Sequence, residues 1–75
     1  MKKNDFINGL KLVLIEKGFE DNLDELFDKR YGMGVFDNNN WFVNSNDCLV
    51  DDIILDEVDM IISDYCRDNG IGFIV

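Results

Sequence analysis

Three glycines set the lengths of the helices that this chain can form. Gly18, Gly32 and Gly70 each follow a stretch in which apolar residues recur every three or four positions, which is the spacing of an amphipathic helix. A glycine at such a place adopts the left-handed backbone conformation at which helices commonly end. The pattern predicts three helices, which run from a cap at Asn4 to Lys17, from Leu23 to Tyr31, and through Ile54–Tyr65 to a stop at Asn69-Gly70.

Capping residues predict the starts of the first two helices, whereas the start of the third helix is ambiguous. Asn4 is a good cap for the first helix, and Asn22 caps the second, with Glu25 three residues further on as its capping-box partner. The third helix has two candidate starts. It begins either near Asp56 and Asp59, which leaves Ile53 and Ile54 in a strand or loop, or a turn earlier at Asp51 or Asp52.

Residues that favour strands fill the segments between the helices. Residues 34–36 and 41–43 flank Asp37-Asn38-Asn39-Asn40, whose side chains tolerate positive φ, and this pattern predicts a tight hairpin. Cys48-Leu49-Val50 is a candidate for a short additional strand, and Ile71–Val75 is predicted to dock into the sheet. We therefore expect a single α+β domain over residues 1–75, with a small, mainly antiparallel sheet of three to four strands, helices packed on one face, and the order α-α-β-β-(β)-α-β.

Acidic residues dominate the second part of the chain. Residues 1–46 hold eight acids and six bases, whereas residues 47–75 hold eight acids and one base, so the formal charge of −9 divides into −2 and −7. An anionic field of this kind repels nucleic acids and acidic membranes, and it speeds the encounter with a basic protein. The longest apolar run, Leu12–Ile15, is too short for a membrane span, and no signal sequence is recognisable. We expect a cytoplasmic protein that binds neither nucleic acids nor membranes directly.

The residue types and their spacing disfavour most catalytic and metal-binding chemistry. The chain has no histidine, which is the commonest general base and metal ligand. Cys48 and Cys66 lack the paired spacing of zinc ligands, and in the absence of a secretion signal we expect both to be free thiols. The Gly-x-Gly stretches at 32–34 and 70–72 lead from a helix into a strand, opposite to phosphate-binding loops, so helix termination and close backbone approach explain them. We expect no enzyme activity, no cofactor and no metal.

The third helix carries the main candidate surface. At 3.6 residues per turn, with Val58 central to its inner face, its acids fall on two outer flanks with Met60, Ser63 and Arg67 between them. Such carboxylates can dock on a basic protein surface, and the alternative is a solvated face of an acidic protein. The predicted partner-binding residues are Asp51, Asp52, Asp56, Glu57, Asp59, Met60, Asp64 and Asp68, together with Trp41.

Two apolar features are further candidates for contact with another protein. Trp41 and Phe42 point to opposite faces of their strand, so one ring belongs to the core and the other is an exposed anchor. Leu12 and Ile15 fall on the outer side of the first helix. They form either a homodimer patch or a surface covered by the second helix or the C-terminal strand, and cover is the favoured interpretation in so small a domain.

In size, charge and lack of catalytic chemistry, the chain resembles the small acidic proteins of phages and mobile elements that inhibit host nucleases, CRISPR effectors or repair enzymes by imitating nucleic acid. The resemblance lies in these general properties and assigns no role to any residue. It implies a non-catalytic inhibitor that docks an acidic surface on the basic groove of a nucleic-acid-binding host protein. The alternative is a small structural or regulatory subunit that forms homodimers.

Overall fold

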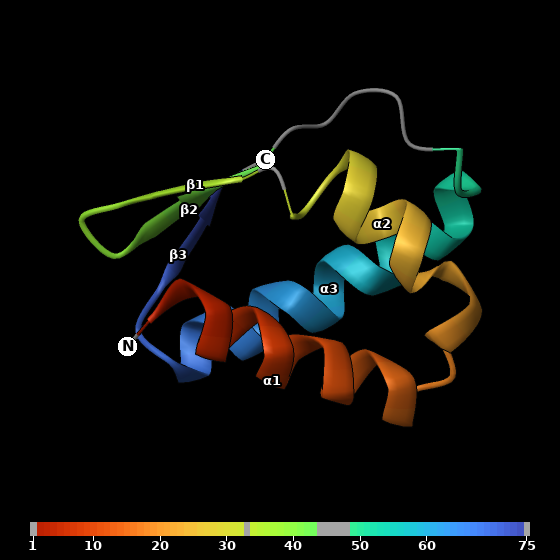
Figure 1. Cartoon of the computed structure of the whole chain (residues 1–75), viewed down its shortest axis with the longest axis horizontal. Coiled ribbons are helices and arrows are strands. Elements are labelled where there is room, and N and C mark those ends of the chain that lie inside the picture. Colours follow the sequence, from red (N-terminus) through yellow and green to blue (C-terminus); the bar gives the residue numbers. More distant parts are fainter. Residues whose placement is uncertain (1, 33, 44–48, 75) are drawn as a thin grey trace.

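The computed structural model describes residues 2–32, 34–43 and 49–74 and confirms the α+β class and the predicted order of elements (Figure 1). Within these residues, three α-helices lie on one face of a three-stranded sheet, and a 3₁₀ turn joins the first two helices. The elements are α1 (Lys3–Glu16), η1 (Glu20–Asn22), α2 (Leu23–Lys29), β1 (Val35–Asp37), β2 (Asn40–Phe42), α3 (Asp52–Asp68) and β3 (Gly72–Ile74).

One of the three helix starts, that of α1, differs from the predicted cap. Asn4 is not the cap of α1, because the helix begins at Lys3 and the N–H of Phe6 already donates to the carbonyl of Lys2. Asn22 does precede α2, yet its side chain accepts no capping hydrogen bond. The earlier of the two candidate starts is correct for α3, because extended Asp51 precedes Asp52, the first helical residue.

The glycines that come after the three helices have two different structural roles. Gly18 and Gly70 have φ values of +96° and +71°, so each supplies the left-handed residue that ends a helix. Gly32 does not adopt a positive φ. A side chain there would overlap the carbonyl oxygen of Phe27, so close backbone approach requires this glycine. Helix α2 ends at Lys29, two residues before the predicted Tyr31.

The sheet has the order β1-β2-β3 and is mixed. Strands β1 and β2 form the predicted antiparallel hairpin, and Asn38 and Asn39 at its tip both have positive φ, as a two-residue type I′ turn requires. Strand β3 pairs parallel to β2, because α3 intervenes and carries the chain back to the same end of the sheet. Leu49 and Val50 form no strand; Cys48, the remaining residue of that candidate strand, lies outside the described residues.

The core lies between the sheet and the helices. The cross-strand row Phe36, Trp41 and Phe73 points toward the helices, and Trp41 is fully buried against them. Helices α1, α2 and α3 add the apolar faces that the sequence pattern predicts, including Leu10, Leu14, Leu26, Val58 and Ile62. The row Val35, Phe42 and Ile74 points away from the helices and stays exposed.

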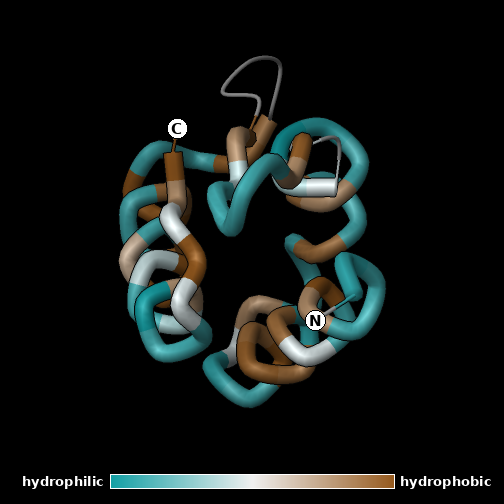
Figure 2. The backbone as a smooth tube through the Cα atoms, turned by 90° about the vertical axis from the view of Figure 1, so that its left-hand side faces the viewer, coloured by the Kyte–Doolittle hydropathy of each residue, from teal (hydrophilic) through white to brown (hydrophobic). Residues whose placement is uncertain are grey.

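Hydropathy alternates along the elements of this fold, as Figure 2 shows by brown and teal stretches within the same helix or strand. This alternation is expected where each element gives only one side to a shared core. In the part of the chain that the structure describes, no helix combines the length and the apolar character needed to cross a membrane.

Gly34 packs closely against strand β2, and a substitution there tests the packing of the core. A Cβ atom on Gly34 would lie 2.8 Å from the carbonyl oxygen of Phe42 and would overlap the indole nitrogen of Trp41. Gly34→Ala should therefore lower the free energy of unfolding by about 2 kcal/mol through overpacking. Ser63→Ala, on the exposed side of α3, should change it by less than about 0.5 kcal/mol. Urea denaturation measures both values, and equal stability of the two variants would contradict the close approach.

Candidate docking surface on helix α3

Helix α3 is fixed by its buried side and presents acids on the other. Val58, Ile62 and Cys66 are buried, and their i, i+4, i+8 spacing keeps one side of the helix against the core. Because 3.6 residues complete a turn, the residues on the opposite side of the helix, such as Met60 and Ser63, face outward. The predicted partner-binding residues that the structure leaves exposed are Asp51, Asp52, Asp56, Glu57, Met60, Asp64 and Asp68.

The middle of this outer side is apolar. Ile53 is 76% exposed and Met60 is 69% exposed, and their separation of seven residues places them on the same side of the helix, two turns apart. Arg67 continues the line and pairs with Asp64 at 2.8 Å. The sequence prediction omitted Ile53 because it left open where the helix begins. The i, i+7 spacing to Met60 would have identified Ile53 once Asp51 was accepted as the cap.

We call this outer side the acidic face: two rows of carboxylates, one of Asp52 and Asp56 and the other of Glu57, Asp64 and Asp68, on either side of Ile53 and Met60. Like charges four residues apart, as in Asp52/Asp56 and Asp64/Asp68, cost about 0.2–0.5 kcal/mol each in helix stability. Asp52 in the first turn of α3 offsets part of that cost by its interaction with the helix dipole. The acidic face therefore carries a net electrostatic cost that the fold itself does not require.

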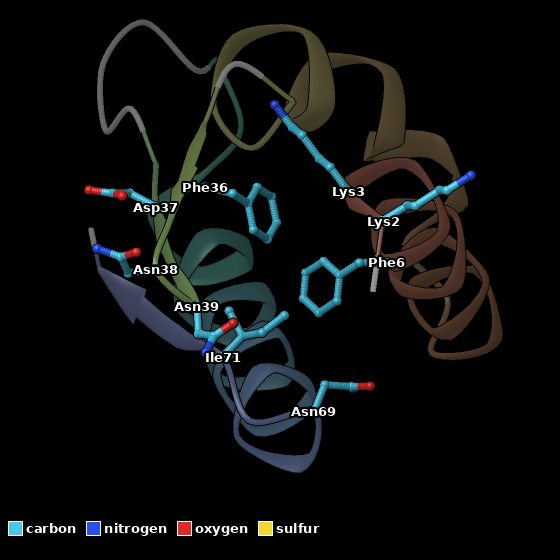
Figure 3. Close-up of a pocket in the computed structure, with 9 residues that line it drawn as sticks. All are labelled: Lys2, Lys3, Phe6, Phe36, Asp37, Asn38, Asn39, Asn69 and Ile71. Carbon is cyan, nitrogen blue, oxygen red and sulfur yellow. The ribbon is translucent and has the colours of Figure 1, made fainter.

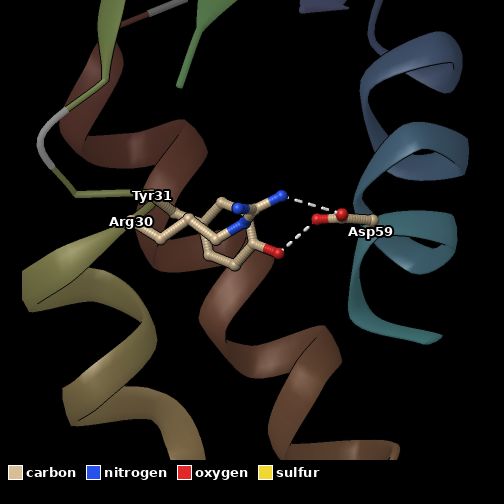
Figure 4. A network of polar contacts seen from close by, with 3 residues as sticks. All are labelled: Arg30, Tyr31 and Asp59. Atoms are coloured by element: carbon tan, nitrogen blue, oxygen red, sulfur yellow. Dashed lines mark hydrogen bonds and ion pairs between the residues drawn. The ribbon is translucent and has the colours of Figure 1, made fainter. Parts of the chain in front are cut away.

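Asp59 does not belong to the acidic face, and its assignment to the partner-binding set is wrong. Its carboxylate accepts a hydrogen bond from the Tyr31 hydroxyl and pairs with the Arg30 guanidinium at 2.9 Å (Figure 4). The Arg30 side chain is only 7% exposed, against 27% for Asp59. Asp59 adjoins Val58 on the edge of the inner side of α3, where the end of α2 reaches it. It is therefore a structural residue.

Burial and the neighbouring carboxylate act together on Tyr31. The surrounding core, and to a lesser extent the hydrogen bond to Asp59, raise the pKa of the Tyr31 hydroxyl well above its usual range. The hydroxyl therefore stays protonated and can donate to Asp59 throughout the physiological pH range. The pair with Arg30 and the bond from Tyr31 connect the segment that follows α2 to the middle of α3.

Trp41 cannot be an anchor for a partner, which corrects a second member of the predicted set. Its ring is fully buried, and Phe42 is the exposed ring of the strand. The alternation along β2 was predicted, but the sequence did not indicate which face the helices would cover. Leu12 is 66% exposed and Ile15 is also exposed, so the expected cover of this patch by the second helix or the C-terminal strand is absent.

A hollow of about 250 Å³ lies between the start of α1 and the tip of the hairpin (Figure 3). Phe6, Phe36 and Ile71 form its apolar part, and polar side chains surround them. The Lys3 ammonium lies over the Phe36 ring, 5.8 Å from its centroid, and donates to the carbonyl oxygen of Gly34 at 2.8 Å. The charge of Lys3 is therefore engaged by groups of the protein itself, and the acidic residue Asp37 lines the same hollow.

The remaining chemistry on the described residues is limited. Cys66 is a free cysteine in the core, and burial raises the pKa of its thiol to about 11, so the nucleophilic thiolate is scarce at neutral pH. Cys48 lies outside the described residues. The described residues contain no group of three or more cysteines and carboxylates that could hold a metal ion.

The role of Asp59 can be separated from that of the acidic face by measuring stability. Asp59→Asn removes the charge that balances Arg30 and should lower the free energy of unfolding by about 2 kcal/mol, because a nearly buried cation loses its counter-ion. Asp56→Asn, three residues earlier on the exposed side, should change it by less than about 0.5 kcal/mol. Chemical denaturation at neutral pH provides the comparison. An Asp59→Asn variant as stable as the Asp56→Asn variant would contradict the structural role of Asp59.

Comparison with known proteins identifies no relative from which a function could be inferred. The chain matches no protein-family model, no curated protein and no solved structure. The acidic face, its apolar centre line of Ile53 and Met60, and its support by the core are therefore the observations on which a function must rest.

Proposed function

We propose that this protein is a non-catalytic binding protein that docks the acidic face of α3 onto a basic surface of another protein. The observation that carries the proposal is the position of its exposed carboxylates, which project from one side of one helix while the opposite side is core. With Ile53 and Met60 exposed between them, the face combines charge with apolar contact area. Protein interfaces commonly combine the two.

The partner we propose is a nucleic-acid-binding protein, such as a nuclease or a CRISPR effector, whose groove normally holds phosphates. An inhibitor encoded by a phage or mobile element and acting in the host cytoplasm would have this character. The net charge of −9 supports a basic partner, because charge complementarity accelerates association and suppresses wrong partners. Membranes and nucleic acids, both anionic, are disfavoured by the same charge.

The carboxylates of the acidic face are spaced too widely to imitate the phosphates of a whole DNA duplex. The five acids of the two rows span about 24 Å of helix axis at a rise of about 1.5 Å per residue, or about one charge per 5 Å, whereas duplex DNA carries about one per 1.7 Å. The acidic face therefore replaces a few phosphates rather than a whole duplex. Contacts with Ile53 and Met60 would supplement this weaker electrostatic attraction.

Competition with DNA tests the proposal. In a panel of nucleases, CRISPR effectors and DNA-binding proteins, we expect this protein to displace a fluorescent DNA duplex from at least one member, with affinity that falls steeply between about 50 and about 200 mM salt. Neutralising four acids of the face should weaken displacement at least about tenfold. The substitutions are Asp56→Asn, Glu57→Gln, Asp64→Asn and Asp68→Asn.

A control variant with the same change in net charge separates the face from the overall field. Asp5→Asn, Asp24→Asn, Asp28→Asn and Asp37→Asn neutralise exposed acids of α1, α2 and β1, and they should weaken displacement by less than about threefold, since exposed charges outside the contact are largely screened. Equal losses in the two variants, or binding that is indifferent to salt, would contradict docking through α3.

Self-association is the second candidate function, and the exposed apolar surface favours it. Leu12 on α1 and the outward row of the sheet, which includes Phe42, are both exposed. A small regulatory or structural subunit could dimerise through either surface. Each copy carries a charge of −9, so a dimer interface must lie away from the acidic face.

Sedimentation decides between the two functions. If self-association is the function, the protein is a dimer at about 50 µM, and one substitution converts it to a monomer: Leu12→Ser for the helix patch, or Phe42→Ser for the sheet face. Because both side chains are exposed, neither change should impair folding. A monomer at this concentration excludes the dimer and leaves the docking proposal.

A further inference from the structure

A groove runs along α3 beside the end of α1, next to one row of the acidic face. It consists of two adjoining hollows, of about 350 and about 250 Å³. Lys17, Ile61 and Asp64 line both of them. The remaining lining residues are Phe19, Glu57 and Met60 in the first hollow, and Val13, Tyr65 and Asp68 in the second.

The groove has an apolar floor, an acidic wall of three residues and one basic lining residue, Lys17. Ile61, Phe19 and Tyr65 are half-buried hydrophobic residues packed against the core, so they provide a fixed floor. The wall consists of Glu57, Asp64 and Asp68, which follow one another at i, i+7 and i+11 along one side of α3. Of these three, only Asp64 is in an ion pair among the described residues, and its pair with Arg67 is largely exposed, so it is weak and easily exchanged.

We propose that this groove is the binding site for an amphipathic, basic helix of the partner protein. The inference rests on the proposed docking through α3 and specifies which element of the partner docks. Each hollow is near or below the lower limit of sites for drug-sized ligands, about 300 Å³, and suits one or two side chains. A lysine or arginine fits both parts, because its aliphatic stem packs on the apolar floor while its charged head reaches the acidic wall.

The spacing of the wall matches the spacing of side chains along a helix. The steps from Glu57 to Asp64 and from Asp64 to Asp68 correspond to about 10.5 and about 6 Å along the axis of α3. A helix lying alongside offers the same two steps through residues seven and four apart, so three basic residues on one side of it can face the three carboxylates. Many nucleic-acid-binding proteins present a basic helix, so the groove is compatible with the proposed partner class.

The experiment titrates the full-length ¹⁵N-labelled protein with a synthetic peptide. The probe is a helical peptide of about 18 residues with leucines on one side and arginines flanking them, and its control has the same composition in an order that forms no apolar side. We expect the amphipathic peptide to bind at least about tenfold more tightly than the control, because only it contacts both floor and wall. Amide signals of Phe19, Ile61 and Tyr65 should shift.

Substitutions in the two rows of acids make the test specific. Glu57→Gln and Asp68→Asn should each weaken peptide binding about threefold, and Met60→Ser by a similar factor. Asp52→Asn and Asp56→Asn carry the same change of charge on the other row and should weaken it by less than about 1.5-fold. All five side chains are exposed, and thermal unfolding of each variant confirms that folding is unchanged.

The outcomes distinguish this inference from the proposed function. Equal binding of the two peptides, or equal losses in both rows, would overturn the groove and leave docking by charge intact. Absence of peptide binding by a protein that still displaces DNA from its partner would do the same. Selective binding in the groove by a protein that displaces DNA from no member of the panel would support the groove and refute the proposed class of partner.

Discussion

Burial of the Trp41 ring holds the parts of this small fold together. Its ring lies within 6.1 Å, between centroids, of Phe6 in α1, Tyr31 after α2, Phe36 in β1 and Phe73 in β3. Such pairs contribute about 0.5–1.5 kcal/mol each beyond the area they bury. A domain of 75 residues has a small core and modest stability, so these contacts decide how the sheet sits on the helices. They also determine which side of β2 remains exposed.

The position of α3 follows from that core and creates the acidic face. Helix α3 connects two strands that lie side by side and parallel, so it must pack across the sheet, and Val58, Ile62 and Cys66 fix its inner side. The acids then fall on the side that water solvates. The exception is Asp59, which approaches the core and is balanced by Arg30 at 2.9 Å. Buried charge on this helix is thus compensated, whereas four carboxylates of its outer rows have no ion pair within the described residues.

Local sequence patterns predict the elements well, and tertiary packing explains the failures. Gly18 and Gly70 mark helix ends because positive φ is a local property, and the turn at Asn38 and Asn39 is local for the same reason. The parallel pairing of β3 with β2 depends on where α3 returns the chain to the sheet. No local sequence pattern predicts that position. Trp41 and Asp59 were assigned to the surface because periodicity places a side chain on a flank or a face without indicating what covers it. Periodicity placed the carboxylates of the acidic face on the outer side of α3 correctly, because the described elements leave that side exposed.

The acidic face and the groove differ in the range over which they act. Exposed carboxylates create a field that guides a basic partner over distances of about one Debye length and is weakened by salt. The apolar floor of Ile61, Phe19 and Tyr65 acts only on contact, and salt weakens it little. Electrostatic complementarity mainly sets how fast complexes form, while well-packed contacts set how slowly they dissociate. A surface that combines both can capture a partner quickly through charge and discriminate among basic proteins through the shape of the groove. Acidic rows of this density, without an apolar floor, would attract many basic proteins and retain few of them.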